Sequence, residues 1–240
     1  MKKLNGFLAM AAAGVLSLVL VPQANATVEV QLSDGTNTIT VLDGGALDSC
    51  ASANCVTFNG IIGAWSINVS TGNATFGLAP SLDLSTVNKT TTNNAPMLTI
   101  LTTATGYTPS AIAAEYFGGG TVNKGGTYSF QSFIGNTNAA FDMSNQIGPT
   151  ETFVAPTAKN AKSSMAFSFD DLTSPIVTSN LYSVTIKSTL VFAAGFVGQA
   201  SSDTTLDLTP TPVPEPAVVS LLGGMMLFTV GAIRRRARRA

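Results

Sequence analysis

The central part of this chain predicts an all-β fold, an antiparallel β-sandwich with one short helix. Between residues 27 and 211, short threonine-rich segments alternate apolar and polar side chains with a period of two. Glycine, asparagine, aspartate, proline and serine separate these segments, and no long helical pattern lies between them. Many short strands joined by turns are typical of two antiparallel sheets packed face to face. An apolar segment flanks this part at each end.

The first 26 residues have the order of a secretory signal peptide. Two lysines follow the initiator methionine, and residues 6–21 are apolar apart from Ser17. Ala24 and Ala26 then place small side chains at an A-x-A cleavage site. We therefore expect export through the Sec machinery, cleavage after Ala26 and a mature chain that begins at Thr27. The alternative is an uncleaved membrane anchor, which would leave the two alanines without a role.

Strands are predicted wherever the alternation is clear, and large aromatic side chains on them are expected to face the core. The predicted strands cover residues 27–32, 37–42, 55–58, 62–71, 82–87, 97–103, 127–134, 164–169, 181–192 and 204–208. The expected core aromatics are Trp65, Phe130, Phe133, Phe167 and Phe169. An alternative for Trp65 is a surface position, from which its indole would stack on a sugar ring.

The short helix is predicted over residues 109–117. Pro109 suits the first turn of a helix, where its missing N–H is not needed, and Thr108 or Ser110 could cap it. Residues 118–120 are three glycines, which would end the helix and form a flexible loop.

The two cysteines, Cys50 and Cys55, have four residues between them. In an exported protein such a pair predicts a disulfide. A metal site would need more soft ligands, and the chain has no histidine. Because the enclosed loop is short, we expect the bond to stiffen a loop rather than to hold the fold together.

The charges of residues 27–211 exclude one class of partner. This part holds five lysines and twelve acidic residues, a net charge of −7. An acidic surface with few lysines is unfavourable for nucleic-acid binding. The polarity comes mostly from threonine, serine and asparagine, as in many secreted surface proteins.

The residues predict no enzyme, no cofactor and no metal. Without histidine there is no Ser-His-Asp or Cys-His arrangement. A pair of acids could serve a glycosidase, but Asp170 and Asp171 are adjacent and would face opposite ways on a strand. We expect them to open the turn that follows. A calcium site that adds Asp203 and Asp207 is a weaker alternative, because the usual dense acidic loop is missing.

The C-terminal tail, residues 212–240, contains a rigid Val213-Pro214-Glu215-Pro216 and then an apolar run over 217–233. As a helix this run would span roughly 26 Å at about 1.5 Å per residue, within the range of membrane helices. The basic end, 234–240, stops transfer and keeps the C-terminus in the cytoplasm. Its arginines are Arg234, Arg235, Arg236, Arg238 and Arg239.

This tail resembles the PEP-CTERM sorting domain of Gram-negative bacteria. The resemblance implies that an exosortase, a membrane enzyme associated with exopolysaccharide and biofilm production, recognises Glu215 and its flanking prolines. The alternative is an ordinary membrane anchor with a proline-rich stalk.

These observations predict an exported structural protein of the cell envelope or extracellular matrix. It would be anchored in the inner membrane as a precursor and then reach the cell surface or matrix. The alternative is a carbohydrate-binding module that recognises exopolysaccharide. An exposed row of aromatic side chains on one sheet would favour the binding module, whereas polar outer faces would favour the structural role.

Overall fold

The computed structural model describes residues 27–77, 79–108, 111–158, 163–173, 176–178 and 180–210. These residues form thirteen strands and no helix. The strands are β1 (Val28–Ser33), β2 (Thr38–Leu42), β3 (Cys55–Ile62), β4 (Trp65–Thr75), β5 (Ser81–Thr90), β6 (Leu98–Tyr107), β7 (Ala111–Asn123), β8 (Gly126–Gly135), β9 (Asn145–Val154), β10 (Ser164–Leu172), β11 (Ile176–Val177), β12 (Tyr182–Phe192) and β13 (Gln199–Pro210).

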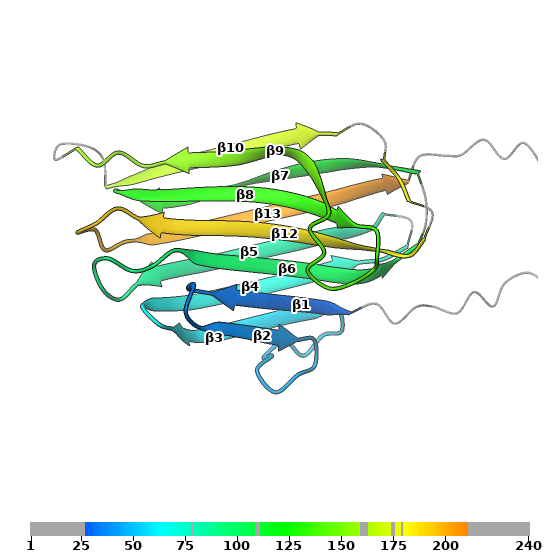
Figure 1. Ribbon diagram of the computed structural model, residues 1–240, viewed down its shortest axis with the longest axis horizontal. Coiled ribbons are helices and arrows are strands. Elements are labelled where there is room, and N and C mark those ends of the chain that lie inside the picture. The colour runs from blue at the N-terminus through cyan, green and yellow to red at the C-terminus, as the bar shows by residue number, and fades with distance from the viewer. Residues whose placement is uncertain are drawn as a thin grey trace, which may run out of the picture.

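Two antiparallel sheets pack face to face, so the predicted β-sandwich is confirmed. The six-stranded sheet has the order β2-β1-β6-β12-β8-β9, and the seven-stranded sheet has the order β10-β7-β13-β5-β4-β3. The short β11 continues the second sheet by pairing with β7. Figure 1 shows the two layers, with β9 and β10 along one long edge of the sandwich and β2 and β3 along the other.

The period-two pattern of the sequence accounts for the core. In β1, Val28, Val30 and Leu32 are fully buried and alternate with half-buried polar residues. Leu82 and Leu84 do the same in β5. Burying a side chain of this size stabilises the fold by roughly 1.5–3 kcal/mol, which is why one face of each strand turns inward.

The predicted short helix is wrong. Residues 111–117 belong to β7, which pairs with β10 on one side and with β13 on the other. Ile112, Ala114 and Tyr116 are all fully buried, which is a period of two and not of 3.6. The alanines favour a helix locally, but the two neighbouring strands and the core override that weak preference.

The predicted flexible loop of three glycines is also wrong, because Gly118, Gly119 and Gly120 lie in the middle of β7. A Cβ atom on Gly120 would collide with the carbonyl oxygen of Ser201, and one on Gly118 would lie 2.7 Å from that of Asp203. The glycines therefore allow β7 to fit closely between its two neighbours.

Strand β9 was not predicted from its sequence. Gly148 and Pro149 interrupt it, and both residues are unfavourable in a central strand. The structure places β9 at the edge of its sheet, where a missing N–H leaves no gap in the ladder.

The long loop between β8 and β9 covers part of the outer face of the six-stranded sheet (Figure 1). In this loop the Phe141 amide donates to Thr103 Oγ1 at 3.3 Å, and Asn138 Oδ1 accepts from the Gly106 amide at 2.6 Å. Thr103 is buried beneath the loop, and Phe133, on the same outer face, is also buried. The seven-stranded sheet thus has the more open outer face.

The described residues include no helix that is long and apolar enough to cross a membrane. The predicted signal peptide, residues 1–26, and the predicted membrane helix, 217–233, lie outside the described residues.

Candidate functional site

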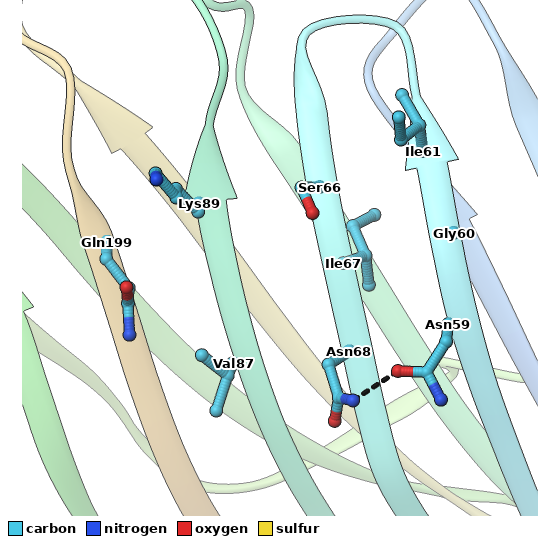
Figure 2. Close-up of a pocket in the computed structure, with 9 residues that line it drawn as sticks. All are labelled: Asn59, Gly60, Ile61, Ser66, Ile67, Asn68, Val87, Lys89 and Gln199. Carbon is cyan, nitrogen blue, oxygen red and sulfur yellow. Dashed lines mark hydrogen bonds between the residues drawn. The ribbon is translucent and has the colours of Figure 1, made fainter.

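A shallow groove of about 460 Å³ crosses the outer face of the seven-stranded sheet. Four neighbouring strands line it, β3, β4, β5 and β13, as Figure 2 shows; all the side chains drawn there point outward except that of Ile67, which is buried in the core. The lining residues are Asn59, Gly60, Ile61, Ser66, Ile67, Asn68, Val87, Lys89 and Gln199. Outward side chains of adjacent strands stand side by side, so the fold gathers them without any local motif.

The groove combines amide groups with aliphatic surface. Asn68 Nδ2 donates to Asn59 Oδ1 across β3 and β4 (Figure 2). Ile61 is 68% exposed and Val87 39% exposed. Amides offer both donors and acceptors, the groups that a hydroxyl-rich ligand requires. The site can therefore bind a polar chain, and its lining contains no histidine, cysteine or carboxylate.

No aromatic side chain among the described residues is exposed. Trp65 is 0% exposed, its indole Nε1 donates to the Pro96 carbonyl at 2.8 Å, and its ring lies 6.1 Å from that of Phe192. The alternative of a sugar-stacking Trp65 is therefore wrong, and its predicted core position is confirmed.

Three of the other four predicted core aromatics pack in or against the core. Phe130 and Phe167 are buried in the core, and Phe169 is half-buried against it. Phe133 is the exception: it is buried, but on the outer face of its sheet and outside the core cluster. Phe153 of β9, which the sequence analysis did not single out, stacks on Phe167 with 4.4 Å between the ring centroids.

The predicted disulfide is confirmed. Cys50 and Cys55 are bonded, with their Cα atoms 5.9 Å apart, and Cys55 is the first residue of β3. Asp48 organises this loop, since Oδ1 accepts from the amides of Cys50 and Thr57 at 2.8 Å each and Oδ2 accepts from that of Gly44 at 2.9 Å. Partial burial acts to raise the pKa of Asp48, but these three amide donors outweigh it and lower the pKa.

The four aspartates considered for calcium do not form one site. Asp170 and Asp171 do not open a turn as predicted but lie on β10, and Asp203 and Asp207 lie on β13. Strand β7 separates these two strands. Within the described residues no group of three or more acids or cysteines is placed to hold a metal ion.

Asp171 lies near a different acid, Glu151 of β9: burial raises the pKa of Glu151, and the neighbouring Asp171 carboxyl raises it further. The sequence contained no signal for this pair, because β9 was not recognised as a strand and the two residues are far apart in the chain.

The predicted sorting and processing residues lie outside the described residues. These are Ala24, Ala26, Val213, Pro214, Glu215, Pro216, Arg234, Arg235, Arg236, Arg238 and Arg239.

Comparison with protein-family models and with curated proteins finds no match. Among solved structures, the adhesin domain of Epf from Streptococcus pyogenes is 10% identical, with a TM-score of 0.39 over 78% of this chain and 60% of that one. The K1 cleaved adhesin domain of Lys-gingipain from Porphyromonas gingivalis W83 is 11% identical, with a TM-score of 0.35 over 70% of this chain and 97% of that one.

TmCBM61, solved in complex with β-1,4-galactotriose, is 8% identical, with a TM-score of 0.30 over 61% of this chain and 88% of that one. The match to the Epf adhesin domain covers only about 60% of the length of that domain. Likeness at this level assigns the chain neither a family nor a ligand.

Proposed function

We propose that this chain is an exported structural protein of the cell envelope or extracellular matrix of a Gram-negative bacterium. Its tail would be the signal by which an exosortase sorts it. The observation that carries the proposal is the order of segments, a leader, a disulfide-bonded β-sandwich, then Pro-Glu-Pro, an apolar run and arginines. The last strand, β13, ends at Pro210, three residues before Val213.

The disulfide supports export. Disulfides persist in oxidising compartments, such as the periplasm and the cell surface, and are rare in the cytoplasm. Cys50 and Cys55 are the only cysteines of the chain, and both are in the bond.

The outer surface supports a structural role more than a sugar-binding one. All aromatic side chains of the described residues are at least half-buried, so no stacking platform is available on this part of the chain. The exposed faces are instead rich in threonine, serine and asparagine.

The tail supports the sorting step by its physical properties. Pro214 and Pro216 each fix φ and disfavour a helix, and so would present Glu215 on an extended backbone just outside the membrane. The arginines after residue 233 are costly to move through hydrocarbon and would hold the apolar run in place.

The test is fractionation of variants in a host that carries an exosortase. Glu215→Ala should leave a folded precursor in the inner membrane, because the change lies in the predicted recognition motif, after the last strand of the sandwich. Replacing the five arginines should instead disturb the orientation of the tail. Glu115→Ala, which changes an exposed acid on β7, is the matched control and should be sorted normally. If Glu215→Ala matures and reaches the surface as the parent does, the tail is an ordinary anchor.

The groove on the seven-stranded sheet favours a second candidate, recognition of exopolysaccharide. Its amides could bind sugar hydroxyls, and Ile61 and Val87 could contact the apolar faces of the rings. Affinity electrophoresis in the exopolysaccharide of the host would test it. Retardation that is lost in Asn68→Ala and kept in Glu115→Ala supports binding in the groove, and no retardation of the parent protein excludes it.

A further inference from the structure

Two acidic side chains face each other where the edges of the two sheets meet. Strand β9 ends the six-stranded sheet, strand β10 ends the seven-stranded sheet, and the two strands are in contact along one edge of the sandwich (Figure 1). Glu151 lies opposite Phe130 and Asp171 lies opposite Tyr116, both on the inward faces of their strands. We call this place the β9–β10 seam.

Glu151 and Asp171 need a positive partner. Both side chains lie on the inward faces of strands that touch, and burial, with the neighbouring Asp171 carboxylate, raises the pKa of Glu151. Two ionised carboxylates close together at this seam would repel each other, more strongly than in water because the seam is partly buried. Either a proton or a cation must therefore neutralise the pair when the protein is folded.

Polar atoms without partners point to a ligand at the seam. Asp171 Oδ2 is buried and has no hydrogen-bond partner. The hydroxyl of Tyr116, a residue that is 0% exposed, is also unpartnered, and this side chain lies directly across the ladder from Asp171. Burial raises the pKa of Tyr116, and the charges of Tyr128, Glu151 and Asp171 raise it further.

The β9–β10 seam has oxygen ligands and enough space for a cation. Edge strands such as β9 and β10 carry backbone carbonyls that no neighbouring strand pairs. Gly148 of β9 lies beside Asp171, and even a Cβ atom added to Gly148 would be 3.9 Å from the Asp171 Cβ. Carboxylate and carbonyl oxygens around a pair of negative charges are the ligands that Ca²⁺ prefers.

We propose that Glu151 and Asp171 bind a divalent cation of the calcium class at the β9–β10 seam. The cation joins the edge of one sheet to the edge of the other, and the Tyr116 hydroxyl positions a carboxylate or a bound water by donating to it. This edge is otherwise held by aromatic contacts such as that of Phe153 with Phe169, whose ring centroids are 6.0 Å apart. The proposal does not depend on the sorting function of the tail.

The test is calorimetric titration of the purified full-length chain with CaCl₂ at pH 7.5, together with thermal unfolding in CaCl₂ and in EDTA. We expect one equivalent of Ca²⁺ to bind with a Kd of about 10⁻⁴–10⁻³ M, the range of extracellular calcium modules. The unfolding temperature should then be higher in CaCl₂ than in EDTA. Glu151→Gln keeps the shape and a hydrogen bond but removes a charge, and should weaken binding by about tenfold or more.

Asp170→Asn is the matched control, because Asp170 is the neighbour of Asp171 on β10 but is exposed on the other face. It should bind Ca²⁺ as the parent does. The proposal is overturned if the parent shows neither heat nor a thermal shift with CaCl₂, or if Asp170→Asn loses binding as fully as Glu151→Gln. An unfolding temperature that rises at low pH but is equal in CaCl₂ and EDTA would also overturn it, since the pair would then share a proton only.

Discussion

Replacing Trp65 by alanine should remove a large part of the stability of the sandwich. Trp65 begins β4, is fully buried, and donates its indole N–H to Pro96. A buried aromatic side chain removes about 150–250 Å² from water, which corresponds to about 4–6 kcal/mol at about 25 cal/mol per Å². Measured substitutions of this kind cost about 3–5 kcal/mol. Because whole domains are stable by only about 5–15 kcal/mol, Trp65→Ala should be severely destabilised.

The assay is equilibrium unfolding in urea, followed by far-ultraviolet circular dichroism. Ile61→Ala is the control, because Ile61 lies on the neighbouring strand β3 but is 68% exposed, and it should change the free energy of unfolding by about 0.5 kcal/mol or less. Trp65 is the only tryptophan of the chain, so native fluorescence reports its burial directly and should be blue-shifted. Equal stability of the two variants, or quenching of the native fluorescence by added oligosaccharides, would refute a core role for Trp65.

Three further predictions concern the loops. Gly63→Ala should lower the unfolding temperature more than Gly35→Ala does. Both glycines have a positive φ, which costs an alanine about 1–2 kcal/mol. Only at Gly63 would the new Cβ also collide with the Asp34 carboxylate. Replacing Cys50 and Cys55 by serine should lower the free energy of unfolding by about 2 kcal/mol and leave the circular dichroism spectrum unchanged, and loss of the spectrum would show that the bond holds the fold. Amide donors from Asn37 and Thr36 lower the pKa of Asp34 below its ordinary 3.8, so the stability it contributes is present above pH 3.8 and is lost as the pH falls through the lowered pKa. Urea titrations in acid should therefore show a steeper loss for the parent than for Asp34→Asn.

The strands with clear alternation could be recognised from their own residues. Strands β1, β2, β5, β6, β8 and β12 fall close to the predicted segments, because apolar and polar residues alternate along each of them. In β6 and β12 the polar face is buried as well, which the alternation did not predict. The same reasoning placed most of the expected core aromatics inside and the two cysteines in a disulfide within a short, polar loop.

Prediction from the sequence failed where contacts with neighbouring strands outweigh the local preference of the residues. The segment that became β7 contains alanines and three glycines, which suggest a helix and a loop. Only the close approach of β10 and β13 on its two sides makes those glycines suitable for a strand. Strand β9 contains a glycine and a proline, and only its place at a sheet edge makes them tolerable.

By itself, the sequence determined the fold class, the disulfide and the order of predicted export and sorting segments, since each depends on residues close together in the chain. Tertiary structure alone decided which distant side chains meet. The groove gathers residues from β3, β4, β5 and β13, and the β9–β10 seam brings Glu151 to Asp171. Strand order and register determine which of these residues meet. Both depend on packing over the whole sandwich, so they cannot be read from a local pattern of residues.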